Sequence, residues 1–183
     1  MSTVSLQKDH DLITKVVKSM EATTSLLEEG KEVPGTILMQ VIDFSTNFTD
    51  ICHHSKEEDS LFPALVGAGM EAEEGPVAMM LQDHEKTREI GARMEASARV
   101  YLAGGGSKDL VADLKEYVQH MTEHLWKESN RLFPMAEARL QHMARKVDAE
   151  VHEIEDAKLR GVKKDRAHYE KLADDLAGHL GSG

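Results

Sequence analysis

Histidine and glutamate recur in this chain at a spacing that suits metal binding. His53 with Glu57 and His124 with Glu128 each form a His-x-x-x-Glu pair. On an α-helix, residues i and i+4 lie above one another on the same face, so each pair presents an imidazole and a carboxylate in one direction. A single pair of this kind is common on solvated helices, so one copy alone would not indicate a metal site.

The two pairs belong to an internal repeat. Residues 53–64 match residues 124–135 at a constant offset of 71, and both stretches carry Leu-Phe-Pro after the glutamate. Upstream, the Asp-His that contains His10 matches the Asp-His that contains His84 at an offset of 74. The chain therefore encodes a helix hairpin twice. Each copy supplies one histidine early in its first helix and a His-x-x-x-Glu pair on its second.

Combining the two copies gives a donor set with a specific chemistry. His10 and His84 add to the two pairs, so four imidazoles and two carboxylates would meet inside a four-helix bundle. That set suits two transition-metal ions bridged by the carboxylates. Burying so many ionisable groups without metal would be costly, which favours a metal site over a purely structural cluster.

Long helices must position these residues, because proline and glycine are sparse and fall between periodic segments. Apolar residues at steps of three and four predict helices from Leu6 to Glu29, from after Pro34 towards Leu65, from about Gly75 to Leu102 and from Lys108 to Ala138. Pro63 is expected to bend or end the last turn of the second helix, since it removes a backbone donor. The charged residues 139–180 predict one or two further helices against the bundle.

Composition supports an all-α fold and excludes several classes of protein. The 183 residues are 40% apolar and 30% charged but only 4% aromatic, which favours helices in one compact domain over β-sandwiches. A formal charge of −11 argues against nucleic acid as a partner. The longest apolar run, Val77 to Leu81, is too short to cross a membrane. A single cysteine and a polar start make the cytoplasm the expected compartment.

These motifs resemble the hemerythrin-like family, also called HHE cation-binding domains, whose pattern is H…HxxxE…H…HxxxE. The resemblance covers about residues 6–140 and includes the Leu-Phe-Pro after each HxxxE. It implies an antiparallel up-and-down four-helix bundle over residues 1–140, with residues 141–183 as a C-terminal helical extension packed on or projecting from it. It also implies a non-haem di-iron centre with an oxo or hydroxo bridge, in which Glu57 and Glu128 bridge. The metal ligands implied residue by residue are His10, His53, Glu57, His84, His124 and Glu128.

Two further histidines leave alternatives open. His54 and Glu58 also form an i, i+4 pair, but Glu57 is the one that lies four residues before Leu-Phe-Pro, as in the second copy. His54 stands where some family members have an additional ligand, and we favour a supporting or water-facing role for it. His120, one turn before the second pair, could lie over the site, although a core or supporting histidine is the favoured interpretation.

The resemblance also bears on function. Oxygen-carrying members resemble a pattern with His-x-x-x-His on the third helix, but here the residue four after His84 is Arg88, which cannot bind metal. The set resembles the intracellular branch, which includes di-iron proteins of iron-centre repair and of nitric-oxide and oxidative-stress responses. It implies binding or reduction of a small diatomic molecule or peroxide, such as O2 or NO. A module that stores, senses or donates iron without turnover is the alternative, and the sequence leaves open enzymatic activity, the redox partner and a choice among iron, manganese and zinc.

Overall fold

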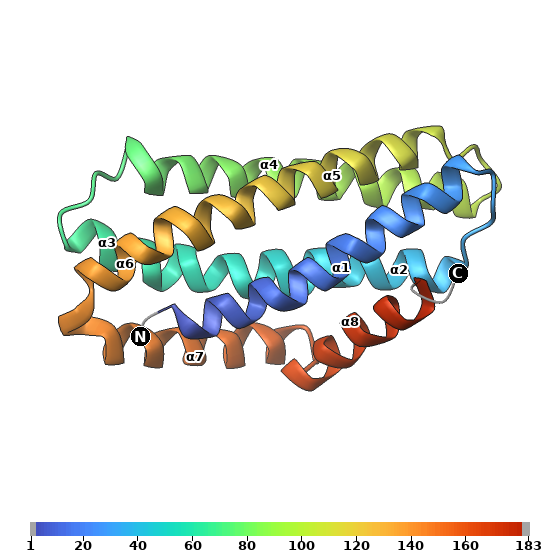
Figure 1. The fold of residues 1–183 in the computed structure, drawn as a ribbon. Coiled ribbons are helices and arrows are strands. Elements are labelled where there is room, and N and C mark those ends of the chain that lie inside the picture. The colour runs from blue at the N-terminus through green and yellow to red at the C-terminus, as the bar shows by residue number, and fades with distance from the viewer. Residues whose placement is uncertain (1–2, 181–183) are drawn as a thin grey trace.

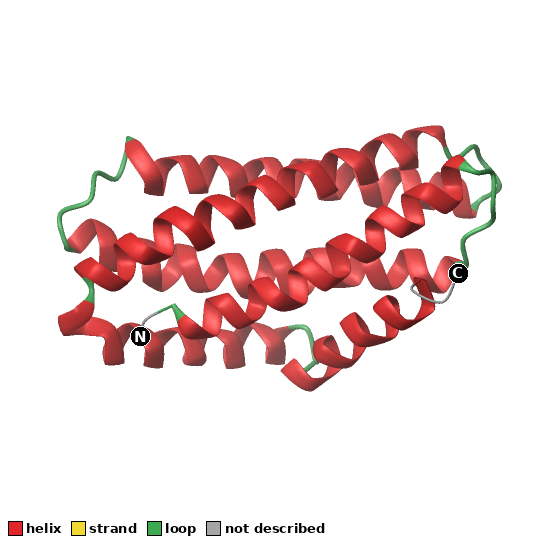
Figure 2. Cartoon of the chain, in the orientation of Figure 1, coloured by secondary structure: helices red, strands yellow, loops and turns green. Residues whose placement is uncertain are grey.

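The computed structural model describes residues 3–180, and helices make up almost all of this part of the chain (Figure 1, Figure 2). No strand occurs among residues 3–180, so the predicted all-α class is confirmed. The first and third predicted helices are α1 (Val4–Glu28) and α4 (Gly75–Leu102), within two residues of their expected bounds. Within the same residues, no helix combines the length and apolar character that crossing a membrane requires.

The second and fourth predicted helices are continuous but not uniform. The second consists of α2 (Gly35–Asp43), the π-helical segments η1 (Phe44–His54) and η2 (Glu57–Leu61), and α3 (Phe62–Gly67). The fourth consists of α5 (Lys108–Lys127), the π-helical turn η3 (Glu128–Leu132) and α6 (Phe133–Arg139). Both glutamates of the repeat are therefore the first residue of a π-helical turn.

Proline explains where two of these π-helical turns fall. η2 and η3 lie directly before Phe62-Pro63 and Phe133-Pro134, the ends of the repeated Leu-Phe-Pro sequences. A proline has no N–H and its ring crowds the preceding turn, so the i→i−4 pattern cannot continue unchanged there. A wider π turn accommodates that ring, and such turns are frequent at functional sites. Pro63 thus changes the hydrogen-bond pattern but does not end the helix, which continues to Gly67.

The four long segments lie lengthwise beside one another (Figure 1). α5 packs between α1 and α4, and η1 contacts the same two helices from the other side. One face of each long segment therefore points into the interior that the four segments share.

Two further helices follow a short 3-10 turn, η4 (Gln141–Met143). α7 (Ala144–Gly161) packs on η1 and η2, and α8 (Arg166–Leu180) packs on α1 and α2. Both run along the edge formed by the first and second long segments (Figure 1). The charged C-terminal stretch thus forms two helices in contact with the rest of the chain.

Two clusters of buried apolar side chains occupy the interior. One cluster extends from the centre towards the α1–α2 connection and includes Met20, Phe48 and Leu114. The other lies towards the Leu-Phe-Pro sequences and includes Leu61 and Leu132. Along the long segments the buried histidines and glutamates of the repeat fall between these two clusters, except that His124 is followed by Leu125 of the first cluster. The apolar core therefore encloses a polar layer from both ends.

The docking of α8 can be tested at Tyr169, which is buried against Phe44 and Phe48 with ring centroids 5.9 and 5.3 Å away. We expect Tyr169→Ala to lower the free energy of unfolding by about 3–5 kcal/mol, because it removes these contacts and leaves a cavity. Tyr169→Phe is the control, with an expected change below about 1 kcal/mol, because the hydroxyl has no hydrogen-bond partner. Chemical denaturation followed by circular dichroism measures both. A Tyr169→Ala variant as stable as the wild type would contradict the docking of α8.

Candidate metal centre

The structure brings all six predicted ligands together in the buried polar layer. The ligating atoms of His10, His53, Glu57 and Glu128 lie within 4.8 Å of one another, and so do those of Glu57, His84, His124 and Glu128. All six side chains are buried, and they come from all four long segments. Both groups contain the same two glutamates. The arrangement is therefore one cluster with two adjacent positions that could each hold a metal ion.

Distances within the cluster suit a metal ion between the donors. The five short separations between a histidine Nε2 and a glutamate oxygen range from 3.2 Å for His10 and Glu128 to 3.8 Å for His84 and Glu128. Two ligands of one metal ion with bonds of about 2.1 Å at a right angle are about 3 Å apart. The donors are thus almost at coordination distance without any rearrangement of the helices.

Unpartnered buried atoms mark the same place. All four carboxylate oxygens of Glu57 and Glu128 are buried without a hydrogen bond, and so are the Nε2 atoms of five histidines, namely His10, His53, His54, His84 and His124. Each buried polar group without a partner costs about 1–3 kcal/mol, and charged groups cost more. Metal cations would provide partners for these oxygens and nitrogens at once. The residues present therefore fit a two-metal centre.

A second set of side chains faces the other nitrogen of each ring, at hydrogen-bond distance in every ring except His124. Nδ1 lies 2.8 Å from Ser129 Oγ in His10, 3.2 Å from Asp9 in His53, 3.3 Å from Asp50 in His54, 2.7 Å from Glu58 in His84 and 3.6 Å from Asp83 in His124. A carboxylate acceptor favours the tautomer with its proton on Nδ1 and leaves the Nε2 lone pair facing the cluster. Histidines that bind metal are typically oriented in this way.

The internal repeat extends to these supporting contacts. An aspartate contacts both a histidine and a lysine of the neighbouring long segment in each copy. The equivalent sets are Asp9, His53 and Lys56 in the first copy, and Asp83, His124 and Lys127 in the second. The two halves of the centre are thus built on one plan, from the glutamates outwards to the lysines.

Two of the supporting aspartates, Asp83 and Asp9, are ionised at neutral pH. Burial by itself would raise the pKa of Asp83, but its contacts with His124 and Lys127 lower the pKa to about 2. Burial opposes ionisation of Asp9 as well, and contacts with His53 and Lys56 outweigh it, so the pKa lies well below the usual range. Both carboxylates therefore accept hydrogen bonds as anions at neutral pH.

Charge inside the cluster favours cations. Burial opposes ionisation of Glu128, but the neighbouring His124 and His10 hold its pKa well below the usual value. Burial by itself would lower the pKa of His84, but its glutamate neighbours outweigh burial and raise the pKa well above the usual value. Glu128 has the largest effect among these glutamates. The pKa of His54 is strongly lowered, mainly because the ring is buried and secondly because His84 lies beside it. The cluster thus keeps an anionic carboxylate while one of its rings stays neutral.

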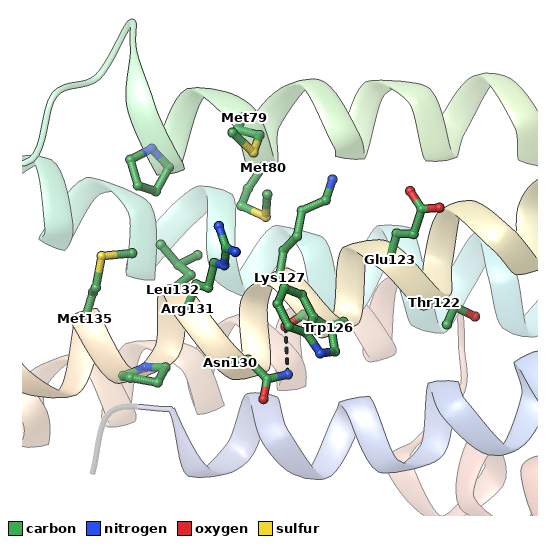
Figure 3. Close-up of a pocket in the computed structure, with 12 residues that line it drawn as sticks. Met79, Met80, Thr122, Glu123, Trp126, Lys127, Asn130, Arg131, Leu132 and Met135 are labelled. Atoms are coloured by element: carbon green, nitrogen blue, oxygen red, sulfur yellow. Dashed lines mark hydrogen bonds between the residues drawn. The ribbon is translucent and has the colours of Figure 1, made fainter.

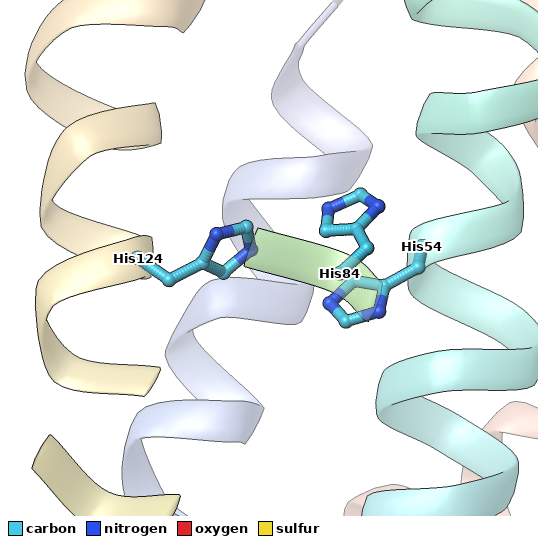
Figure 4. Close-up of side chains that lie close together, drawn as sticks. All are labelled: His54, His84 and His124. Atoms are coloured by element: carbon cyan, nitrogen blue, oxygen red, sulfur yellow. The ribbon is translucent and has the colours of Figure 1, made fainter. Parts of the chain in front are cut away.

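His54 is a fifth histidine beside the cluster, and the sequence left its role open among ligand, supporting residue and water-facing residue. It is completely buried, and its ligating nitrogen groups with those of His84 and His124 within 4.8 Å (Figure 4). Its ring stacks on His84 at a centroid distance of 3.8 Å. Its burial excludes the water-facing role and is compatible with either a supporting residue or a ligand. The repeat contained a signal, because the equivalent of His54 in the second copy is Leu125, a buried apolar residue.

Two other residues of the sequence analysis lie beside the cluster. His120 is half-buried, and its Nε2 lies 2.9 Å from the backbone carbonyl of Asp83, which matches the supporting role favoured for it. Arg88 donates to Asp50 at 2.8 Å and to Glu58 at 2.5 Å. These are the two acids behind His54 and His84, so Arg88 ties their positions together.

Two surface hollows lie near the cluster. One, of about 350 Å³ between α1 and α5, is lined by His10 and Ser129 together with polar neighbours. The other, of about 1000 Å³, lies between α4 and the fourth long segment and is lined largely by apolar residues such as Met79 and Trp126 (Figure 3). Only the first is lined by a residue of the cluster. This hollow reaches the His10 side of the centre.

Comparison with known families agrees with this geometry. The sequence model of the hemerythrin HHE cation-binding domain matches residues 2–136, a range that contains every histidine and glutamate of the cluster and ends before α7. No curated protein and no solved structure matched the chain significantly. The family match covers well over half of the chain, so this chain belongs to the hemerythrin HHE cation-binding domain family.

Proposed function

We propose that this chain is a non-haem di-iron protein that binds or reduces a small molecule, namely O2, NO or peroxide. The observation that carries the proposal is the pair of buried glutamates shared by two groups of histidines. In this proposal the four long segments form the antiparallel up-and-down bundle of the family over residues 1–140. Residues 141–183 form the extension, of which the structure describes residues up to 180.

The proposed ligands divide unequally between the two positions. His10 and His53 would hold one iron, and His54, His84 and His124 would hold the other. Glu57 and Glu128 would bridge, which gives the first position four protein ligands and the second position five. Octahedral iron takes six ligands, so the first position is the more open one.

Iron at this centre supplies a reversible change between the ferrous and ferric states. The chain supplies access and protection. The hollow beside His10 leads small molecules to the more open position, and its other lining residues, such as Gln7 and Asn130, are polar. The two apolar clusters enclose the polar layer from both ends and limit the entry of bulk water. A small uncharged molecule can therefore reach a site that remains largely dry.

Metal content tests the centre itself. We expect about two irons per chain in protein made in iron-sufficient cells and purified without a tag or chelator. Replacing Glu57 and Glu128 with Gln removes both bridging charges, so the double variant should keep less than about half of that iron by elemental analysis. Glu123→Gln, an exposed change on α5, is the matched control and should keep all of it. Undiminished iron in the double variant would contradict the proposal.

The fifth histidine can be tested against the second copy of the repeat. His54→Leu places in the first copy the residue type found at the equivalent Leu125. We expect the variant to fold and to bind one of its two metal ions at least about ten-fold more weakly, because one donor is missing. His142→Gln is the control and should leave both affinities unchanged, since His142 is exposed and lies outside the cluster. Equal affinities in His54→Leu and wild type would restrict the ligands to the six predicted ones.

Reactivity separates the proposal from its alternative. Anaerobically reduced, iron-loaded protein should consume at least one of O2, NO and peroxide in proportion to its iron, with a change in visible absorption that stopped-flow mixing follows. The Glu57→Gln, Glu128→Gln double variant is the mixing control. If none of the three is consumed while iron passes readily to a chelator, the alternative is favoured, in which the chain stores, senses or donates iron without turnover.

A further inference from the structure

The two copies of the repeat differ in what lies behind their lysines. In the second copy, Lys127 contacts Asp83 and its side chain is 31% exposed. In the first copy the equivalent Lys56 is completely buried. The cover over Lys56 comes from α7 and α8, which lie outside the part of the chain that matches the family model. An addition to the family domain therefore reaches one half of the centre.

Two charged side chains of these helices complete a ring of four charged groups, of which only Arg166 is partly exposed. Glu155 on α7 accepts hydrogen bonds from Lys56 at 2.5 Å and from Arg166 at 2.9 Å. Arg166 on α8 also donates to Asp9 Oδ1 at 2.8 Å. Lys56 contacts the other oxygen of Asp9, Oδ2, which lies 3.2 Å from Nδ1 of His53. Through Asp9, the ring of four charged groups therefore contacts His53, a proposed metal ligand.

Charge and burial make the four groups depend on one another. The ring contains two acids and two bases, so it is neutral as a whole. Asp9 and Lys56 are fully buried and Glu155 is almost so. A buried charge that loses its partner must move or take up water, because its desolvation is no longer compensated. Loss of Arg166 would leave Asp9 Oδ1 without this donor. The carboxylate of Asp9 could then change its position relative to the ring of His53.

We propose that Glu155 and Arg166 are positioning residues of the metal centre, which fix Asp9 and through it His53. The metal position formed by His10 and His53 then depends on the C-terminal helix pair, whereas the position formed by His84 and His124 does not. The inference rests on the proposed function, because it requires these histidines to bind metal. A ring that merely docked α7 and α8 would not distinguish the two positions.

The experiment is a titration of the metal-free full-length chain with Co²⁺, followed by visible absorption and by competition with a chelator. We expect Arg166→Ala to bind one of its two Co²⁺ ions about ten-fold more weakly and the other unchanged, as for loss of a residue that orients a ligand. Arg166→Lys should recover part of the loss, because a cation remains. Lys15→Ala is the matched control, since it removes an exposed 2.8 Å ion pair with Asp174 between α1 and α8 without touching Asp9.

A combined variant assigns the weakened position. His54→Leu acts on the His84–His124 position, so adding it to Arg166→Ala should weaken both ions rather than one of them further. If Arg166→Ala does not fold, Glu155→Gln takes its place and should again weaken one ion selectively. Equal weakening of both ions by the single variant, or no weakening, would overturn the inference. A wild-type chain that fails to bind two Co²⁺ ions would contradict the proposed function itself, which keeps the two failures distinguishable.

Discussion

The structure depends on two carboxylates held away from water at the centre of a helical bundle. Glu57 and Glu128 are fully buried, and their contacts in the described residues are with histidines. Around them polar groups follow in layers, from the imidazoles to the acids behind four of the five rings, and finally to lysine and arginine. Each layer compensates the desolvation of the one inside it. Without that order, so many ionisable groups could not occupy the interior of a bundle.

Backbone geometry delivers both carboxylates in the same way. Glu57 and Glu128 each open a π-helical turn that ends at Leu-Phe-Pro. The same three-residue sequence, with a proline that cannot continue the i→i−4 pattern, therefore follows the backbone of each glutamate that faces the centre. The duplicated hairpin thus repeats a local distortion as well as its ligands, which gives the centre its approximate symmetry.

Features that depend on residues close together in the sequence could be predicted from it, whereas features that depend on packing between helices could not. The helix bounds, and the six residues that the structure brings together, could be predicted because periodicity and the repeat are written along the chain. Supporting contacts were not, since Asp9 stands next to His10 in sequence but contacts His53 on another helix. The role of Glu155 and Arg166 was equally hidden, because it exists only once α7 and α8 have packed. Sequence identified the donors, and packing determined what holds them.

Trp126 is the only tryptophan in the chain, and it stands on the turn between His124 and Glu128. Its indole is 54% exposed at the edge of the apolar hollow, with the guanidinium carbon of Arg131 5.3 Å from the ring centroid. The emission of an indole responds to charges nearby, and the charge at the centre changes when cations arrive or leave. The chain therefore carries a single tryptophan, and this fluorophore lies beside the proposed redox site, able to report on that site in solution without any added label.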